Sequence, residues 1–239
     1  MRKKHLFYAI LIFALSFVFQ ALSLFGLQQV GNLSETERRR FAANYVKAKK
    51  YHDEGRKLLD KGDLDKAQEK FLLSVETLPD FAESYVGLGN VRMKKQMFDE
   101  AIDEYKKASE AYLRLETYAT RGILVTTGAD RENNVFSRDL YQDLYSGKFS
   151  VPAHVFLFLG GAYFKKGMLD EALEQFNKAI SIKPSYGEAH NNVAVVYFLK
   201  KEYKEAWRHL KIAQELHAQV NPKFVEDLKK VYPEPPDNK

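Results

Sequence analysis

Between residues 48 and 220, small and large apolar residues recur in a fixed order. Four pairs of small residues mark the recurrence: Gly55 and Ala67, Gly89 and Ala101, Gly160 and Ala172, and Ala194 and Ala206. The copies span residues 48–81, 82–115, 153–186 and 187–220, so the period is 34. Large apolar residues lie three and four positions from the small ones, which is the spacing of one face of an α-helix. The pattern therefore predicts helices in every copy.

Each copy also contains a short polar stretch between its two small residues. The four stretches read KGDLDKA, KQMFDEA, KGMLDEA and KEYKEA. Lysine is favoured in the last turn of a helix and acidic residues in the first turn, because of the helix dipole. These stretches therefore predict a turn between two helices. Pro79 and Pro184 end the second helix of two copies, because proline cannot continue it.

This period and these residues resemble the tetratricopeptide repeat (TPR). The resemblance covers somewhat over half of the chain. It implies an all-α fold, a right-handed superhelix of antiparallel helix pairs in which the small residues lie where two helices cross closely.

The segments around the copies are expected to extend this array. Ser34 and Glu37 form a capping-box pattern, which predicts a helical lead-in over 34–47 that begins at Glu35. Residues 116–152 lack the small residues but are about one repeat long, and we expect a degenerate helical pair that keeps the superhelix continuous. The alternative is an extruded loop. Asn221 and Pro222 predict a capping helix over 221–232, followed by a disordered tail over 233–239.

Residues 6–27 form a long apolar run after a basic N-terminus, residues 1–5. Crossing a bilayer takes about 20 apolar residues, so the run predicts an N-terminal hydrophobic helix that serves as a transmembrane anchor. The alternative is a cleaved signal peptide, since Ala21 and Ser23 form a small-x-small pattern.

The charges beside the apolar run predict its orientation. The basic residues 1–5 favour the cytoplasmic side, which places the repeats on the periplasmic or extracytoplasmic side. The basic run Arg38–Arg40 weakens this orientation, because it follows the apolar run closely. Cleavage of the signal would make the protein secreted or periplasmic.

Composition and charge narrow the function further. The 239 residues include no cysteine, which excludes disulfides, thiol catalysis and cysteine zinc sites. The formal net charge is +5, and Arg2, Lys3 and Lys4 supply three of these charges, so the rest of the chain matches a nucleic-acid backbone poorly. Phosphate loops, nucleophile elbows and histidine pairs at metal-ligand spacing on one helix are absent from the sequence. We expect no enzyme, no metal or other cofactor, no nucleic acid and no small-molecule substrate.

The resemblance implies a recognition module, in which the first helix of each pair lines a concave groove that binds a partner peptide or helix. The family's groove positions in the last three copies give these partner-binding candidates: Asn90, Met93, Leu157, Phe158, Gly161, Phe164, Asn191, Asn192, Val195, Phe198 and Leu199. Apolar contacts would supply most of the affinity, while Asn191 and Asn192 would hydrogen-bond a peptide backbone. The alternative is that the phenylalanines pack between helices.

Three other features give further expectations. In some members of the family a lysine and asparagine clamp grips a C-terminal carboxylate, and the clamp is absent here because His52 and Arg56 stand at its first-repeat positions. His209 and His217 are expected to be solvated. Trp207 is expected to pack against a neighbouring helix or to lie on the convex surface.

The sequence therefore predicts a non-enzymatic, membrane-tethered scaffold that mediates protein–protein interaction or assembles an envelope complex through its groove. The alternative is a soluble exported module that binds anionic ligands such as cell-wall polymers. That module would use the basic helix carrying Arg38–Arg40, Lys47, Lys49 and Lys50. Salt separates the two hypotheses, because it screens binding between exposed charges.

Overall fold

The computed structural model describes residues 35–120 and 151–235. The chain divides into two units, Met1–Val46 with Arg114–Phe149 and Lys47–Leu113 with Ser150–Lys239. The described parts of the first unit are helical and belong to the start of α2 and the end of α5. The second unit contains the repeats. The described residues form helices, turns and loops without a strand, which confirms the all-α class.

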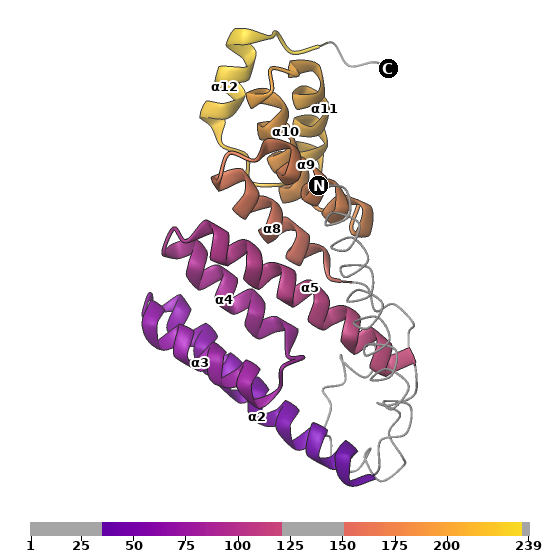
Figure 1. Cartoon of the computed structure of the whole chain (residues 1–239). Coiled ribbons are helices and arrows are strands. Elements are labelled where there is room, and N and C mark those ends of the chain that lie inside the picture. The colour runs from indigo at the N-terminus through magenta and orange to yellow at the C-terminus, as the bar shows by residue number, and fades with distance from the viewer. Residues whose placement is uncertain (1–34, 121–150, 236–239) are drawn as a thin grey trace, which may run out of the picture. The chain divides into compact units, whose positions relative to one another are not determined.

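The repeats are helical hairpins that follow one another along the second unit (Figure 1). Their helices are α2 (Glu35–Asp60) and α3 (Leu64–Thr77), α4 (Ala82–Lys94) and α5 (Phe98–Thr120), α8 (Ala153–Lys165) and α9 (Leu169–Ile182), and α10 (Gly187–Leu199) and α11 (Tyr203–Glu215), followed by α12 (Pro222–Val231). α2 has no break, so residues 35–47 and the first helix of repeat one are one helix. α5 likewise continues past residue 115.

The turn inside each hairpin has the same backbone geometry in all four repeats. The second residue after the first helix has a positive φ: 81° at Gly62, 60° at Gln96, 77° at Gly167 and 64° at Lys201. The next N–H then donates to a carbonyl five residues back, as from Met168 to Tyr163 at 3.0 Å and from Glu202 to Tyr197 at 2.9 Å. This arrangement satisfies carbonyl groups at the helix end, and glycine adopts it without steric strain.

Within each hairpin, a small residue on the first helix faces a large one on the second. A Cβ atom on Gly160 would lie 2.6 Å from the Phe176 ring, and one on Gly55 would lie 2.8 Å from Phe71. Gly89 faces Tyr105 in the same way. In repeat four the small residue is Ala194 and its counterpart is Leu210, which is smaller than an aromatic ring. The close crossing predicted at the small residues is confirmed.

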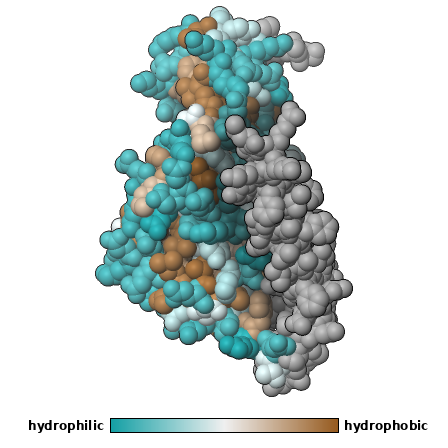
Figure 2. Space-filling model, in the orientation of Figure 1, coloured by the Kyte–Doolittle hydropathy of each residue, from teal (hydrophilic) through white to brown (hydrophobic). Residues whose placement is uncertain are grey.

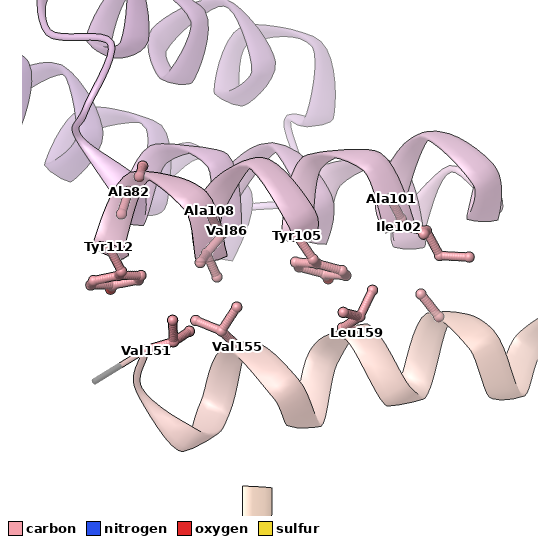
Figure 3. Close-up of a cluster of buried hydrophobic side chains, with 12 residues drawn as sticks. Ala82, Val86, Ala101, Ile102, Tyr105, Ala108, Tyr112, Val151, Val155 and Leu159 are labelled. Carbon is pink, nitrogen blue, oxygen red and sulfur yellow. The ribbon is translucent and has the colours of Figure 1, made fainter. Parts of the chain in front are cut away.

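Neighbouring repeats pack through the third, seventh and tenth residues of each first helix. In repeat three, Val155 and Leu159 of α8 point at Tyr105 and Tyr112 of α5 (Figure 3). The corresponding residues in repeats two and four are buried against the preceding repeat: Ser84, Leu88 and Val91, and Ala189, Val193 and Val196. Burying apolar area at roughly 25 cal/mol per Å² stabilises each of these junctions.

The two ends of the array differ from its interior. In repeat one, the third, seventh and tenth residues are Lys50, Glu54 and Lys57, so its outer face is charged and needs no preceding repeat. At the other end, α12 buries Leu228 completely against α10 and α11. Repeat arrays need a polar or covered outer face at both ends. Here the outer face of repeat one is polar, and α12 covers the outer face of repeat four.

An ion pair joins each repeat to the one before it. Lys95 pairs with Asp65 at 2.7 Å, and Lys200 pairs with Asp170; both pairs are 30 residues apart. Lys166 makes the equivalent pair with Asp99, although 67 residues separate them. Together with the packing of Val155 and Leu159 on α5, this pair shows that repeat three stacks directly on repeat two.

The direct junction corrects one expectation from the sequence. A helical pair formed by residues 116–152 was expected to stand between repeats two and three, but α8 packs on α4 and α5 with no pair of helices between them. Residues 116–120 belong to α5, and residues 121–150 lie outside the described residues. For residues 121–150 the helical pair and the extruded loop both stay predictions.

The C-terminal segment is fixed over part of the length predicted to be disordered. The Trp207 indole N–H donates to the Tyr232 carbonyl at 3.0 Å, and the Lys211 ammonium donates to the Pro235 carbonyl at 3.1 Å. Lys211 and Lys229 also lie 3.9 and 3.5 Å from the Glu234 carboxylate. The prediction is therefore wrong for 233–235, and residues 236–239 lie outside the described residues.

The expected anchor or signal peptide, residues 6–27, lies outside the described residues. Within 35–120 and 151–235, no helix combines the length and apolar character that crossing a membrane requires.

Candidate functional site

The candidate residues lie on α4, α8 and α10, the first helices of repeats two, three and four, and we call this set the first-helix face. Leu157 is buried, with 3% of its surface exposed, and belongs to the core between repeats three and four. The others are half-buried, except Leu199, which is 49% exposed. On the side displayed in Figure 2, apolar surface forms separate patches among hydrophilic residues.

The aromatic residues of the first-helix face pack on the core and keep part of their surface exposed. Phe158 lies 5.9 Å from the Tyr105 ring and 5.8 Å from the His154 ring, between ring centroids. Met93 packs on the same cluster as Phe158, and Phe164 packs on the next cluster, which Phe158 also contacts. The structure thus brings Met93, Phe158 and Phe164 together on adjoining parts of the core.

Phe198 lies apart from these residues, at the C-terminal end of the array. Its ring is 5.6 Å from Phe224 of α12 and 5.9 Å from Tyr203. α12 therefore covers part of this side chain, as the packing alternative anticipated for one of the phenylalanines. Val195 is half-buried on the same helix.

Gly161 is open, in contrast with its neighbour Gly160. A Cβ atom on Gly161 would meet no other atom of residues 35–120 and 151–235 within 4 Å. Phe158 and Phe164 lie three residues before and after it, so they flank it on the same side of α8. The surface of α8 at Gly161 thus carries no side chain between the half-buried Phe158 and Phe164, and we call this bare position the Gly161 notch.

The three asparagines of the face are in different situations. The Asn90 side-chain oxygen accepts a hydrogen bond of 2.7 Å from the Tyr105 hydroxyl. Burial raises the pKa of Tyr105, which keeps this hydroxyl protonated and able to donate. The Asn191 side-chain oxygen is buried and has no hydrogen-bond partner in the described part of the chain. Asn192 is half-buried.

Comparison with known families now identifies the repeats. A family model described as "Tetratricopeptide repeat" matches residues 52–112, and one described as "TPR repeat" matches residues 160–201. These segments are tetratricopeptide repeats. The resemblance drawn from the sequence is thereby confirmed for both halves of the array. Curated proteins give no match to this chain.

Solved structures resemble the TPR array more loosely. A mutant form of MamA is 22% identical, with 71% of this chain and 96% of that chain covered and a TM-score of 0.40. PilF of Pseudomonas aeruginosa is 18% identical, with 80% and 86% covered and a TM-score of 0.38. YrrB, described as a TPR protein with an unusual peptide-binding site, is 24% identical, with 75% and 90% covered and a TM-score of 0.31. The assignment rests on the family models.

The first repeat of the TPR array holds a buried hydrogen-bond chain instead of a carboxylate clamp. The Ser74 hydroxyl donates to the Ala48 carbonyl at 2.8 Å, and the Ser84 hydroxyl donates to Ser74 at 2.7 Å. His52 Nδ1 lies 3.2 Å from Ser84 and therefore donates to it. Burial lowers the pKa of His52, so the neutral ring is favoured. The guanidinium of Arg56 lies 4.0 Å from Asp53.

The basic surface proposed for anionic ligands lies on α2 as far as it is described. Lys49 pairs with Asp53 at 3.2 Å, and the Lys47 ammonium lies 5.9 Å from the centre of the Tyr51 ring. Part of its charge is therefore engaged within the chain. No observation in the described residues favours an anionic ligand over a peptide.

One prediction about histidine is wrong. His209 is buried with 6% of its surface exposed, and its Nδ1 lies 3.0 Å from Nδ1 of His190, which is equally buried. His190 Nε2 donates to the Pro184 carbonyl at 3.1 Å, and an Arg208 nitrogen donates to His209 Nε2 at 3.0 Å. His217 is exposed, as expected. The sequence marks neither histidine as a partner of the other, because their meeting depends on how α10 and α11 cross.

This hydrogen-bond chain admits one arrangement of protons when both rings are neutral. His190 must carry its proton on Nε2, because the Pro184 carbonyl can only accept, and His209 must then carry its proton on Nδ1. The pKa of His209 is lowered to about 4, chiefly by burial; Arg208 and His190 also lower this pKa, and Glu205 raises it. Trp207, next to this pair, is buried at 1% exposure, which confirms packing rather than a surface position.

Metal chemistry finds no support in the described residues. Among residues 35–120 and 151–235, no group of three or more histidine, aspartate or glutamate side chains is placed to hold a metal ion.

Proposed function

We propose that the chain is a membrane-tethered, non-enzymatic scaffold that binds a peptide or helix of a protein partner on its first-helix face. TPR pairs are recognition elements in the family, and this face carries several half-buried aromatic and aliphatic side chains. The observation that carries the proposal is that Met93, Phe158 and Phe164 pack on adjoining core clusters and stay half-buried, with the open Gly161 between the two phenylalanines on α8. Within the described part of the chain these side chains keep exposed surface, which a partner segment would bury.

Asn191 and Asn192 are the polar residues proposed to orient the partner. The buried Asn191 oxygen lacks a donor, and an unmade buried hydrogen bond costs about 1–3 kcal/mol. A backbone N–H of a bound segment is the kind of donor that would satisfy this oxygen, after a small movement of the side chains that cover it. Orientation would then come from the asparagines, and most of the affinity from the aromatic contacts.

The membrane tether remains part of the proposal. An apolar run as long as 6–27 supports an anchor, and the basic residues before it support a TPR array on the extracytoplasmic side. The mass of the mature N-terminus tests this directly. A protein that begins at Leu24 would show cleavage after Ser23 and would replace the anchor by a signal peptide.

Site-specific photocrosslinking in host membranes tests the binding face. A benzoylphenylalanine is placed at Asn192 or at Phe164 of the first-helix face, and control variants carry it at Leu72 or Ile182, which are 39% exposed on second helices. We expect one discrete crosslinked species from the first-helix face and none from the controls. Equal crosslinking from both pairs of positions would contradict the proposal.

A further inference from the structure

The lysines at the ends of α4 and α8 show which kind of segment the first-helix face would accept. Each of these helices ends in a lysine, Lys94 or Lys165, and a second lysine, Lys95 or Lys166, follows it directly. Lys95 and Lys166 are used within the array, because they make the ion pairs that join neighbouring repeats. Lys94 and Lys165 are exposed and make no ion pair within the described part of the chain.

These two unpaired lysines lie on the same side of their helices as the half-exposed apolar residues. Lys165 follows Gly161 by four residues, and Lys94 follows Asn90 by four, so each shares a helix face with a residue of the first-helix face. A lysine stem can lie along apolar surface while its ammonium group stays in water. The Gly161 notch therefore has a positive charge within reach at its C-terminal side.

The charge is confined to one end of the face. Glu83 is exposed near the start of α4, eleven residues before Lys94, and a helix rises about 1.5 Å per residue, so the two are about 16 Å apart along the axis. At the position of Lys94 and Lys165, repeat one has Asp60 and repeat four has Leu199. The basic spot is thus specific to repeats two and three, where Met93, Phe158 and Phe164 come together.

We infer that the first-helix face takes an acidic, apolar segment of a protein partner: one large apolar side chain seated in the Gly161 notch, with carboxylates a few residues away that pair with Lys165 and Lys94. This inference rests on the proposed function, since it names the chemistry of the segment bound at that face. Gly161 has no packing reason to be glycine, and Lys94 and Lys165 have no partner in the described array. An acidic, apolar segment accounts for both.

Selection from a phage-displayed library of random 12-residue peptides tests the inference on the full chain in detergent. The wild type is expected to enrich peptides in which aspartate or glutamate lies within about four residues of leucine, isoleucine, phenylalanine or methionine. The variant Lys94→Glu/Lys165→Glu is expected to lose this acidic bias. The control Lys61→Glu/Lys201→Glu carries the same charge change on exposed lysines beside the same kind of turn, and it should keep the bias.

One selected peptide, labelled with fluorescein, then gives affinities by fluorescence anisotropy. Lys94→Glu/Lys165→Glu should weaken binding about tenfold, since an exposed ion pair contributes roughly 0.2–1 kcal/mol and reversal adds repulsion. Raising the salt concentration should weaken wild-type binding and should strengthen binding of the variant, because salt screens attraction and repulsion alike. Gly161→Leu should abolish binding by filling the notch, while Gly161→Ala should have a small effect, with the helicity of both variants preserved.

The outcomes separate the two levels of the argument. If the wild type selects no peptide, the proposed function fails, and the inference fails with it. If peptides are selected without an acidic bias, or if Gly161→Leu binds as the wild type does, the inference is overturned while the face can still bind peptides. Peptides whose acidic bias also disappears in Lys61→Glu/Lys201→Glu would show a response to net charge alone and would equally overturn the inference.

Discussion

Acidification is expected to loosen repeat four before the rest of the array, because of the buried pair His190 and His209. The two rings share a hydrogen bond of 3.0 Å between their Nδ1 atoms, and the outer nitrogens face the Pro184 carbonyl and Arg208. A proton added to His209 would point at the guanidinium of Arg208. The folded state therefore resists protonation of this histidine, while the unfolded chain accepts it.

The magnitude follows from the pKa of His209. It is lowered from 6.5 to about 4, chiefly by burial, so the histidine contributes stability that is fully present above pH 6.5 and is lost as the pH falls toward 4. At about 1.4 kcal/mol per pH unit, the full effect is roughly 3 kcal/mol, and about 2 kcal/mol of it is lost between pH 7.5 and pH 5.0. Glu205 and the Tyr197 ring also face His209, and both residues are the same in the wild type and in the variant used to test this effect.

Urea unfolding at pH 7.5 and pH 5.0 measures the effect, with Trp207 as the local probe, since it is the only tryptophan of the chain. The matched variant is His190→Phe/His209→Gln, because Phe156 and Gln175 occupy the same two positions in repeat three, where Gln175 is buried. The wild type should lose about 2 kcal/mol more than the variant when the pH is lowered. His52 and His154, whose pKa values burial also lowers, are present in both proteins and cancel.

Two results would refute this reasoning. Equal losses of stability in the wild type and the variant would show that the histidine pair does not carry the acid sensitivity. A larger loss in the variant would show that the buried histidine pair is a source of stability in its protonated form, which contradicts the assignment of donors and acceptors.

Three further predictions concern packing, the binding face and a turn. Gly160→Ala should destabilise the protein by about 1–3 kcal/mol in urea unfolding, because its Cβ would lie 2.6 Å from Phe176. Adding Phe176→Leu should recover part of the loss, because repeat four packs an alanine against a leucine at the same two positions. Asn191→Leu, which copies Leu157 of repeat three, should keep or raise the urea midpoint, because it removes a buried oxygen without a partner, and should weaken binding of a selected peptide. Lys201→Gly should stabilise by about 0.5–1 kcal/mol in the same assay, because φ is 64° there.

Each of these predictions has a contrary outcome. The packing explanation fails if Gly160→Ala leaves the stability unchanged. It also fails if Phe176→Leu destabilises the Gly160→Ala variant as much as it destabilises the wild type. Loss of stability in Asn191→Leu would show that the asparagine supports the fold rather than a partner. If Lys201→Gly destabilised the protein, the lysine side chain would stabilise the fold by more than the strain of its positive φ destabilises it.

The sequence determined the architecture of the TPR array. Its period, the glycine or alanine on each first helix and the lysine-to-acid turns are local signals, because helix faces and turn geometry depend on residues a few positions apart. Gly160 lies opposite the large Phe176, and the larger Ala194 lies opposite the smaller Leu210, so the sizes of the two facing residues compensate in both repeats. Fold class and repeat identity were accordingly predictable.

Only the tertiary structure decided how individual side chains are used. Leu157 and Phe158 are adjacent in sequence and equally apolar, yet one is buried in the core and the other half-exposed, because the packing of neighbouring helices sets the exposure of each position. His190 and His209 looked like unrelated polar residues, and their pairing depends on two rings meeting across a hairpin.

The junction between repeats two and three is the clearest case. Asp99 and Lys166 lie 67 residues apart, and the sequence marks neither as a partner of the other. Their pairing follows from the direct packing of α8 on α5, which buries the Val155 and Leu159 side chains. Local pattern fixes which residues form a helix face, whereas the choice of the surface that this face meets depends on contacts between segments distant in the chain.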